Sequence, residues 1–159
     1  MSCPQCRATG VHDTDSCERL FQEVIGHEFS RSELFGVHRL TVDAYSLQHP
    51  DRYMKSTKSA AAHLSGMCWS LEYGAGESVS RTLSGWLAGP VELPRVEPPP
   101  SCERGRLTIR HVHDAGGSPE HPARVREWAE SVWEAWDVGH AQARAWVDAL
   151  VGARPGGQE

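Results

Sequence analysis

The sequence has few of the features by which membrane proteins and nucleic-acid-binding proteins are recognised. Only two of its sixteen basic residues are lysines, and the arginines are scattered along the chain rather than gathered into a basic stripe. The formal net charge of −5 does not favour contact with phosphate backbones or anionic lipid. Apolar runs are only a few residues long, whereas a transmembrane helix needs roughly 20 residues. We therefore expect no membrane span and no nucleic-acid partner.

Signals for secretion and for common catalytic motifs are absent as well. The N-terminus shows no basic stretch followed by an apolar one, so no signal peptide is expected. Five cysteines without such a signal favour thiols that stay reduced in the cytoplasm over a disulfide framework. No Gly-x-Ser-x-Gly elbow, P-loop or His-Glu-x-x-His motif occurs. The unusual counts that remain are those of cysteine, histidine and tryptophan, at five, nine and six residues.

The spacing of apolar residues predicts a mainly α fold within a single domain, residues 1–159. We expect a bundle of four to five helices with an irregular, cysteine-containing N-terminal cap and a proline-rich internal linker. The first helix begins near Ser16, and apolar periods place the others at 39–48, 56–73, 78–88 and 122–151. The predicted segments are a zinc-knuckle-like cap at 1–18, helices over 19–88, a linker at 89–105, and a strand-like segment with a long C-terminal helix over 106–151.

The N-terminal cysteines form the sharpest local pattern. Cys3 and Cys6 are separated by two residues, and Cys17 follows after ten more. A Cys-x-x-Cys turn lets two thiolates hold one tetrahedral metal ion, so we predict a zinc ion shared by these three cysteines. The fourth ligand is His12, His38 or Cys102, of which His38 is preferred because it begins the helix after the Phe35-Gly36 break. The alternatives are incidental thiols in a disordered start and a dithiol redox pair.

Three further histidines suggest a second centre within the bundle. His63 and His140 fall on the inward faces of two predicted helices, and His49 lies at the exit of a third. Histidines from separate helices are how metal sites are built in bundle cores. We predict that the three imidazoles converge, with Asp43 hydrogen-bonded to one of them, and that Asp43 or Tyr45 orients a ligand or transfers a proton. The alternative is that each histidine is a satisfied core or helix-end residue.

Several motifs along the chain also carry a family resemblance. They are Cys3-Pro4-x-Cys6 with Cys17, Thr41-Val42-Asp43-Ala44-Tyr45 with Gln48-His49-Pro50, Ser59 with His63-Leu64, and Trp128-Ala129-x-Ser131-Val132-Trp133-x-Ala135-Trp136 with His140. Together they resemble a bacterial family known only as a domain of unknown function, over nearly the whole chain. The sequence departs from that pattern at Gly139, where a second histidine is expected before His140.

A weaker, architectural resemblance is to the DinB-like bacterial proteins. These are helical bundles that hold a divalent metal with three histidines from different helices, and His49, His63 and His140 are similarly distributed. Their spacing does not match that family's pair on one helix, so the resemblance remains an analogy.

Two functions are compatible with these patterns. The first is a small cytoplasmic bacterial metalloprotein, with a structural zinc ion and a second divalent metal that acts on a small-molecule substrate. The second is a non-enzymatic, zinc-stabilised helical interaction module in which the histidines and tryptophans are structural.

Overall fold

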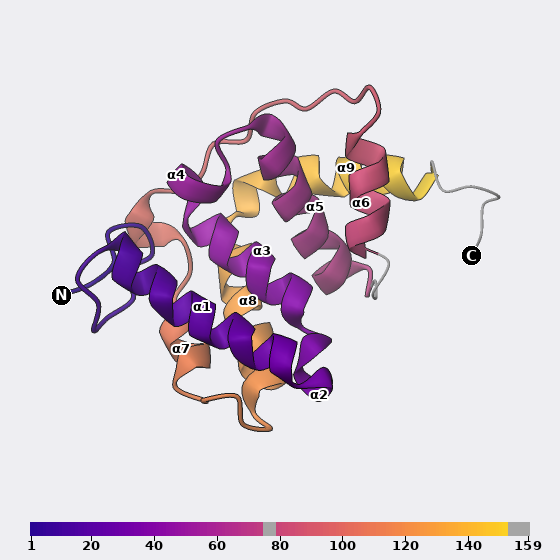
Figure 1. Cartoon of the computed structure of the whole chain (residues 1–159). Helices are drawn as coiled ribbons and strands as arrows, with labels where there is room; N and C mark the ends of the chain where they lie inside the picture. Colours follow the sequence, from indigo (N-terminus) through magenta and orange to yellow (C-terminus); the bar gives the residue numbers. More distant parts are fainter. Residues whose placement is uncertain (75–78, 153–159) are drawn as a thin grey trace.

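The described part of the chain, residues 1–74 and 79–152 of a computed structural model, is built from helices (Figure 1). The α-helices are α1 (Thr14–Ser30), α2 (Ser32–Phe35), α3 (His38–Gln48), α4 (Pro50–Tyr53), α5 (Thr57–Glu72), α6 (Val79–Leu87), α7 (Ile109–His113), α8 (His121–Ala135) and α9 (His140–Gly152). Short 3₁₀ turns lie at Ser101–Glu103 and Asp137–Gly139. In these residues the only β-type pairing is an isolated bridge between Ser2 and Thr9. The mainly helical fold is therefore confirmed.

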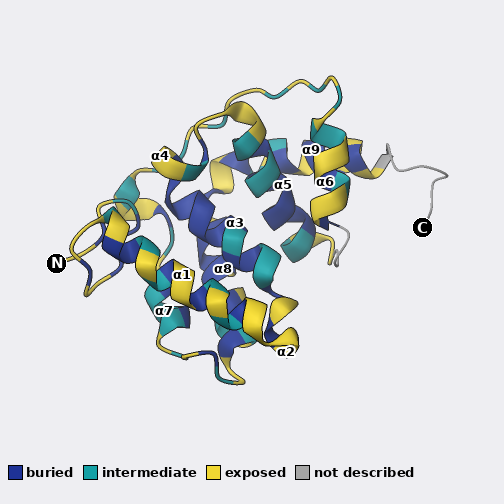
Figure 2. Cartoon of the chain, in the orientation of Figure 1, coloured by how far each residue is buried: buried dark blue, intermediate teal, exposed yellow. Residues whose placement is uncertain are grey.

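The helix α3 lies at the centre of the molecule. It packs against α1, α5 and α8, and Figure 2 shows it as largely buried among them. Eight of its eleven residues are buried, so both its apolar and its polar faces meet other helices. A polar side chain on such a helix needs a partner inside the protein, because an unpaired buried polar group costs about 1–3 kcal/mol. The partners of the α3 side chains therefore determine much of the interior.

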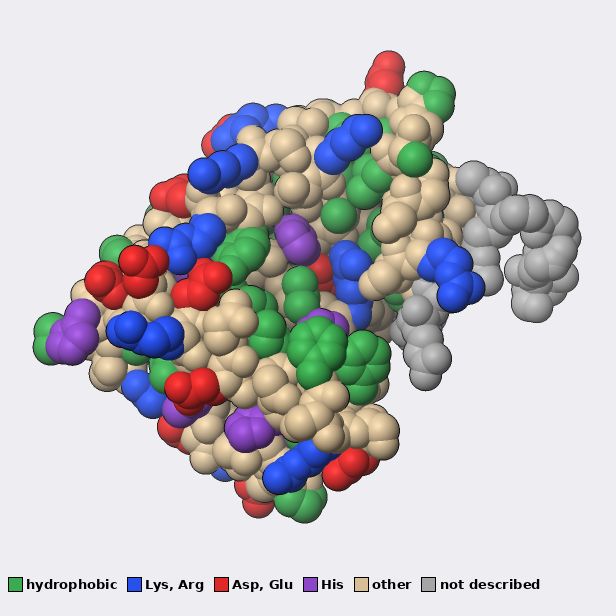
Figure 3. Space-filling view, in the orientation of Figure 1, with side chains coloured by type: hydrophobic (Ala, Val, Ile, Leu, Met, Phe, Trp, Pro, Cys, Tyr) green, Lys and Arg blue, Asp and Glu red, His purple; other side chains and the backbone are tan. Residues whose placement is uncertain are grey.

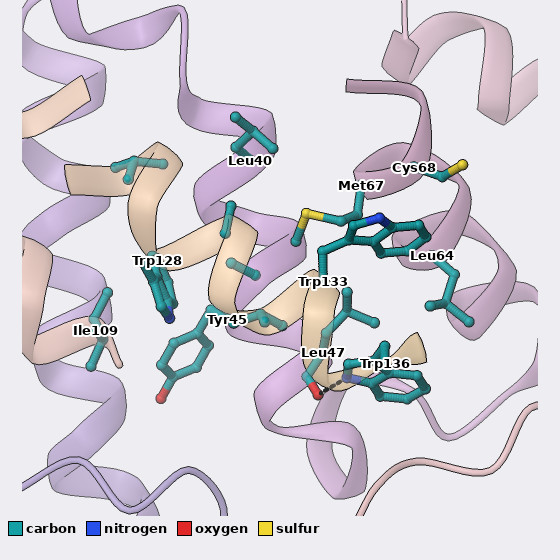
Figure 4. Close-up of a cluster of buried hydrophobic side chains, with 14 of the residues drawn as sticks. Leu40, Tyr45, Leu47, Leu64, Met67, Cys68, Ile109, Trp128, Trp133 and Trp136 are labelled. Carbon is teal, nitrogen blue, oxygen red and sulfur yellow. Dashed lines mark hydrogen bonds between the residues drawn. The ribbon is translucent and has the colours of Figure 1, made fainter. Parts of the chain in front are cut away.

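Hydrogen bonds join the C-terminal end of α3 to α8 and to the proline-rich segment. The Gln48 amide donates to the carbonyls of Arg104 at 3.0 Å and Leu107 at 2.8 Å, and its oxygen accepts from Trp128 Nε1 at 2.9 Å. Trp136 Nε1 donates to the Leu47 carbonyl at 3.1 Å, as drawn in Figure 4. Both tryptophans are fully buried, so the indole rings fill the core while their N–H groups stay paired.

The predicted helices at 39–48, 56–73 and 78–88 agree with α3, α5 and α6. The first helix begins slightly earlier than expected, because Asp13 is its N-cap and forms a capping box with Ser16. The count of four to five helices was too low. The chain also forms α2, α4 and α7, each only four or five residues long. Apolar periodicity cannot detect helices shorter than two turns.

The prediction of a strand-like segment near 106–113 was wrong, because Ile109–His113 forms a helix. Thr108 caps a short helix there, α7, and Ile109 and Val112 are both buried at the i, i+3 spacing of one helical face. The two histidines of this helix point to the surface and pair with glutamates, His111 with Glu127 and His113 with Glu23.

The single helix predicted over 122–151 is divided into α8 and α9. The 3₁₀ turn Asp137–Gly139 separates them, and a Cβ on Gly139 would lie 3.1 Å from a side-chain carbon of Val96 in the proline-rich segment. The predicted inward positions are nevertheless all buried: Val132, Trp136, Gly139, Ala143, Trp146 and Leu150. No described helix has the length and apolar character needed to cross a bilayer.

A close approach between α3 and α5 depends on Gly66. A Cβ at this position would lie 2.4 Å from the Asp43 carboxylate and 2.7 Å from the Arg39 guanidinium. We expect Gly66→Ala to lower the free energy of unfolding by about 1–3 kcal/mol, because the buried Asp43 has to shift. Gly26→Ala is the matched control, since nothing lies within 4 Å of its Cβ position on α1. That change should raise the free energy of unfolding by about 0.5–1 kcal/mol. Thermal or urea unfolding of both variants measures the difference, and equal effects would contradict the close packing.

Candidate metal centre

Four buried side chains meet where the N-terminal segment lies against α1 and α3. They are Cys3, Cys6, Cys17 and His49, and one ligand atom from each lies within 4.8 Å of all the others. Among the described residues, this is the one group of three or more Cys, His, Asp or Glu side chains with that arrangement. All four cysteine and histidine side chains are at most 3% exposed. The group can therefore bind a metal ion out of contact with solvent.

The segment around Cys3 and Cys6 is folded into a tight turn that aims both sulfurs inward. The Cys3 N–H donates to the Ala8 carbonyl at 2.9 Å, and the Arg7 N–H donates to the Cys3 carbonyl at 2.8 Å. The Ala8 N–H points at Cys6 Sγ from 3.4 Å. Arg7 has a φ of +70°, the left-handed conformation that closes the turn. The predicted Cys-x-x-Cys turn is thus present as a folded element.

The other two ligand atoms come from helix ends. Cys17 lies in the first turn of α1, after its capping box. His49 is the C-cap of α3, where the following Pro50 disfavours helical geometry and the backbone has φ −130° and ψ 57°. This backbone change lets the His49 ring fold back over Tyr45, with ring centroids 3.8 Å apart. The turn before Pro50 therefore delivers the imidazole to the cysteines.

Hydrogen bonding places the hydrogen of His49 on the ring nitrogen that faces away from the cysteines. Nδ1 lies 2.7 Å from the Tyr45 carbonyl, which can only accept, so Nδ1 carries the hydrogen. Nε2 then presents its lone pair at 3.6 Å from both Cys3 Sγ and Cys17 Sγ. Metal-bound histidines commonly have this arrangement, with the second ring nitrogen donating to a carbonyl or carboxylate.

The distances between the ligand atoms fit a tetrahedral zinc site. Zinc–sulfur bonds of about 2.3 Å and zinc–nitrogen bonds of about 2.0–2.1 Å require roughly 3.8 Å between two sulfurs and roughly 3.5 Å between sulfur and nitrogen. The Cys6 and Cys17 sulfurs are 3.8 Å apart, and both measured sulfur–nitrogen distances are 3.6 Å. Structural zinc sites with three cysteines and one histidine have this ligand set.

The electrostatics of the cluster favour a cation at its centre. Hydrogen bonds from Cys17 and Cys6 lower the pKa of Cys3, so Cys3 is the thiol that ionises first. The pKa of Cys6 is raised by its hydrogen bonds to Cys17 and Cys3 and by burial. The pKa of Cys17 is raised to about 11, chiefly by its hydrogen bond with Cys3. Three thiolates cannot coexist here unless a positive charge compensates them.

The surroundings of the cluster are closed and ordered. The Tyr45 hydroxyl donates to Cys17 Sγ at 3.4 Å, and its ring stacks on Phe21 with centroids 4.0 Å apart. Burial raises the pKa of Tyr45, so this hydroxyl keeps its hydrogen and acts as a donor. Arg104 holds the outer side of the turn through the Gln5 carbonyl and side chain at 3.1 and 3.0 Å. Tyr45, predicted as an orienting or proton-transfer group of a second centre, instead lies at the cysteine cluster.

The three candidates for the fourth ligand all lie elsewhere. His38 lies at the opposite end of α3 from His49, and its Nδ1 is 2.8 Å from the Glu28 carboxylate of α1. His12 contacts Met1 Sδ at 2.9 Å on the surface, and Cys102 is an exposed free cysteine. The choice of His38 was therefore wrong, because His38 already has a buried carboxylate as partner. The grouping of the three cysteines was right.

The prediction that His49, His63 and His140 converge was also wrong, because each has a different partner. His49 belongs to the cysteine cluster, and each of the other two histidines has its own hydrogen-bond partner. His63 Nδ1 lies 2.9 Å from the Asp43 carboxylate, which confirms the predicted hydrogen bond between Asp43 and a histidine. His140 Nε2 donates to the Trp133 carbonyl at 2.7 Å, and its ring stacks on Trp133. The helical spacing of the apolar residues correctly predicted that His63 and His140 turn toward the interior. It does not specify which residue each ring contacts.

A second polar cluster, centred on Glu28, was not predicted from the sequence. Glu28 is completely buried, and it accepts hydrogen bonds from His38 Nδ1 and His121 Nε2 at 2.8 Å and from the Thr41 hydroxyl. Burial raises the pKa of Glu28, but these hydrogen bonds outweigh it and leave the pKa below its ordinary value. His121 Nε2 carries the hydrogen that Glu28 accepts, and His121 Nδ1 is buried without a hydrogen-bond partner among the described residues.

Comparison with known proteins identifies one family. Residues 1–137 match the model of DUF5946, described as a family of unknown function. No curated protein and no solved structure matches the chain, and the analogy with DinB-like bundles thus gains no support.

The Glu28 cluster should make stability depend on pH. Because the pKa of Glu28 is lower in the folded protein than its ordinary value of 4.5, the ionised carboxylate stabilises the fold above about pH 4.5. That stabilisation is lost as the pH falls through the lowered pKa. We expect Glu28→Gln to reduce the free energy of unfolding at pH 7 by about 2–3 kcal/mol, with a smaller difference from the unsubstituted protein in acid.

Urea unfolding across the acid range measures this difference. Glu134→Gln is the control, because Glu134 is exposed on α8, and a surface change of this kind should stay within about 0.5 kcal/mol. An ionised Glu28 would be contradicted if the difference in free energy of unfolding between Glu28→Gln and the unsubstituted protein grew as the pH falls.

Proposed function

The chain belongs to the DUF5946 family, whose function is unknown, and from its site we propose that Cys3, Cys6, Cys17 and His49 bind one structural zinc ion. The observation that carries the proposal is the match between their separations and the edges of a zinc tetrahedron: 3.8 Å between Cys6 and Cys17, and 3.6 Å from His49 to each of two sulfurs. Three thiolates and an imidazole form a soft ligand set that suits zinc rather than magnesium or calcium.

The number of ligands favours a structural role over a catalytic one. Four protein ligands complete a tetrahedron, whereas catalytic zinc sites have three and leave the fourth position to water or substrate. The cluster is also buried, Tyr45 stacks on His49, and Phe21 stacks on the Tyr45 ring. A zinc ion here neither activates water nor polarises a substrate. The metal-dependent enzyme considered from the sequence therefore loses its reaction centre, and the zinc-stabilised helical module is the better description.

The zinc ion would fix the N-terminal turn to the rest of the protein. Residues 1–13 contain no regular helix, and their buried apolar side chains are few: Cys3, Cys6, Ala8 and Val11. Such a segment gains little from hydrophobic burial and has a high conformational entropy to lose on folding. Metal binding supplies the free energy, because a structural zinc site is formed only in the folded state. The thiolate ligands require a reducing compartment, which supports a cytoplasmic location.

Metal content is the first test. We expect the protein, purified under reducing conditions without added metal, to contain one equivalent of zinc by elemental analysis. Cys6→Ser should lose most of this zinc, because hydroxyl oxygen is a poor substitute for thiolate. Cys102→Ser should retain it, since Cys102 is exposed and outside the cluster. A protein without zinc that shows a Cys3–Cys6 disulfide by mass spectrometry would instead support the dithiol redox pair.

The identity of the fourth ligand is the second test. His49→Ala should abolish tight zinc binding, whereas His38→Ala should leave it unchanged, because His38 pairs with Glu28. His49→Cys keeps the ligand count at four, so its zinc content should return to one equivalent. Substituted cobalt provides the readout, since its visible absorption reports tetrahedral thiolate coordination. Loss of that absorption in His38→Ala but not in His49→Ala would show that the ligand assignment is wrong.

A further inference from the structure

A cleft opens at the other end of α3 from the cysteine cluster. It has a volume of about 660 Å³, and its lining comes from α2, α3, α5, α6 and α8. The lining includes Phe35, His38, Arg39, Val79, Ser80 and Arg126. Figure 3 shows the surface hollowed beside α6, with basic and histidine side chains inside the hollow. Cavities of this size hold small organic molecules. None of the four cluster residues lines it.

His38 is presented to this cleft in a fixed orientation. Its Nδ1 is bonded to the buried Glu28 carboxylate at 2.8 Å, and its ring stacks on Phe35 with centroids 5.1 Å apart. A carboxylate can only accept, so Nδ1 carries the hydrogen and the neutral ring has its lone pair on Nε2. Nε2 has no hydrogen-bond partner among the described residues. The side chain is 20% exposed, so a ligand can reach it.

Two arginines of the lining differ in the number of hydrogen bonds and ion pairs that they make within the protein. Arg39 donates to the Asp43 carboxylate at 2.8 Å, to Ser80 at 3.1 Å and to the Ala62 carbonyl at 2.9 Å, which holds it in the wall. Arg126 is exposed on α8 and makes no ion pair or hydrogen bond with any described residue. Its guanidinium can therefore pair with a ligand. Among the described residues of the lining, Glu33 on the short α2 is the one acidic side chain.

We propose that this cleft binds a small organic anion that also carries a hydrogen-bond donor, with Arg126 pairing with the anion and His38 Nε2 accepting from the donor. The apolar body of the ligand lies against Phe35 and Val79. Glu28 acts as a positioning residue, because it holds His38 in the tautomer that can accept. The site is separate from the zinc ligands, so zinc content and cleft binding are measured independently.

Three probes separate the two polar contacts. 4-Hydroxybenzoate carries both an anion and a donor, benzoate carries only the anion, and phenol carries only the donor. Calorimetric titration should show saturable one-site binding that is tightest for 4-hydroxybenzoate. Arg126→Gln should weaken 4-hydroxybenzoate and benzoate about tenfold and leave phenol unchanged, because a charge-assisted hydrogen bond is lost. His38→Phe should weaken 4-hydroxybenzoate and phenol but not benzoate.

The controls make the result decisive. Arg19→Gln, at an exposed arginine of α1 outside the lining, should bind all three probes as the unsubstituted protein does. Glu33→Gln should strengthen binding of the two anions, because it removes the acidic charge beside them. Side-chain nuclear magnetic resonance of the histidines should show His38 shifting most on titration. Absence of saturable binding for all three probes, or equal losses for all three in Arg126→Gln, would overturn the proposal.

Discussion

The burial of α3, in which eight of eleven residues are buried, is the constraint from which the interior follows. Each buried polar side chain of such a helix must find an internal partner, and α3 carries Thr41, Asp43 and Gln48 inside the protein. Thr41 meets Glu28 of α1, Asp43 meets His63 of α5, and Gln48 meets the indole of α8 and the carbonyls of the proline-rich segment. Directional bonds of this kind fix the position of each neighbour, which apolar contact alone does not do.

The cysteine part of the cluster was predictable from sequence, and its histidine was not. Cys-x-x-Cys spacing constrains the local backbone, so Cys3 and Cys6 point together whatever the remainder of the fold does. His49 reaches the sulfurs only because α3 ends before Pro50 and because α1 lies beside it, and those facts depend on tertiary packing. The Tyr45 and His49 rings are four residues apart and stack on one face of α3. Without knowledge of which helix that face meets, His49 could equally be assigned to the bundle centre.

Buried polar residues were missed for a related reason. Cys17, Phe21, Val24 and Glu28 step by four, three and four along α1, and all four are buried. A glutamate at the end of an apolar stripe is usually taken as the exposed border of that stripe. Here Glu28 stays inside because two imidazoles and a hydroxyl donate to it. Similarly, the inward positions of the last segment were correct while its single helix was not, because side-chain phase survives a short 3₁₀ turn at Gly139.

The two sites are placed at opposite ends of the same buried helix. His49 caps the C-terminal end of α3 and reaches the cysteines, while His38 begins the helix and faces the cleft. Eleven helical residues span roughly 16 Å, and no residue belongs to both sites. The zinc ion proposed for the cysteine cluster would hold the C-terminal end of α3, and the N-terminal end of the same helix presents His38 to the cleft.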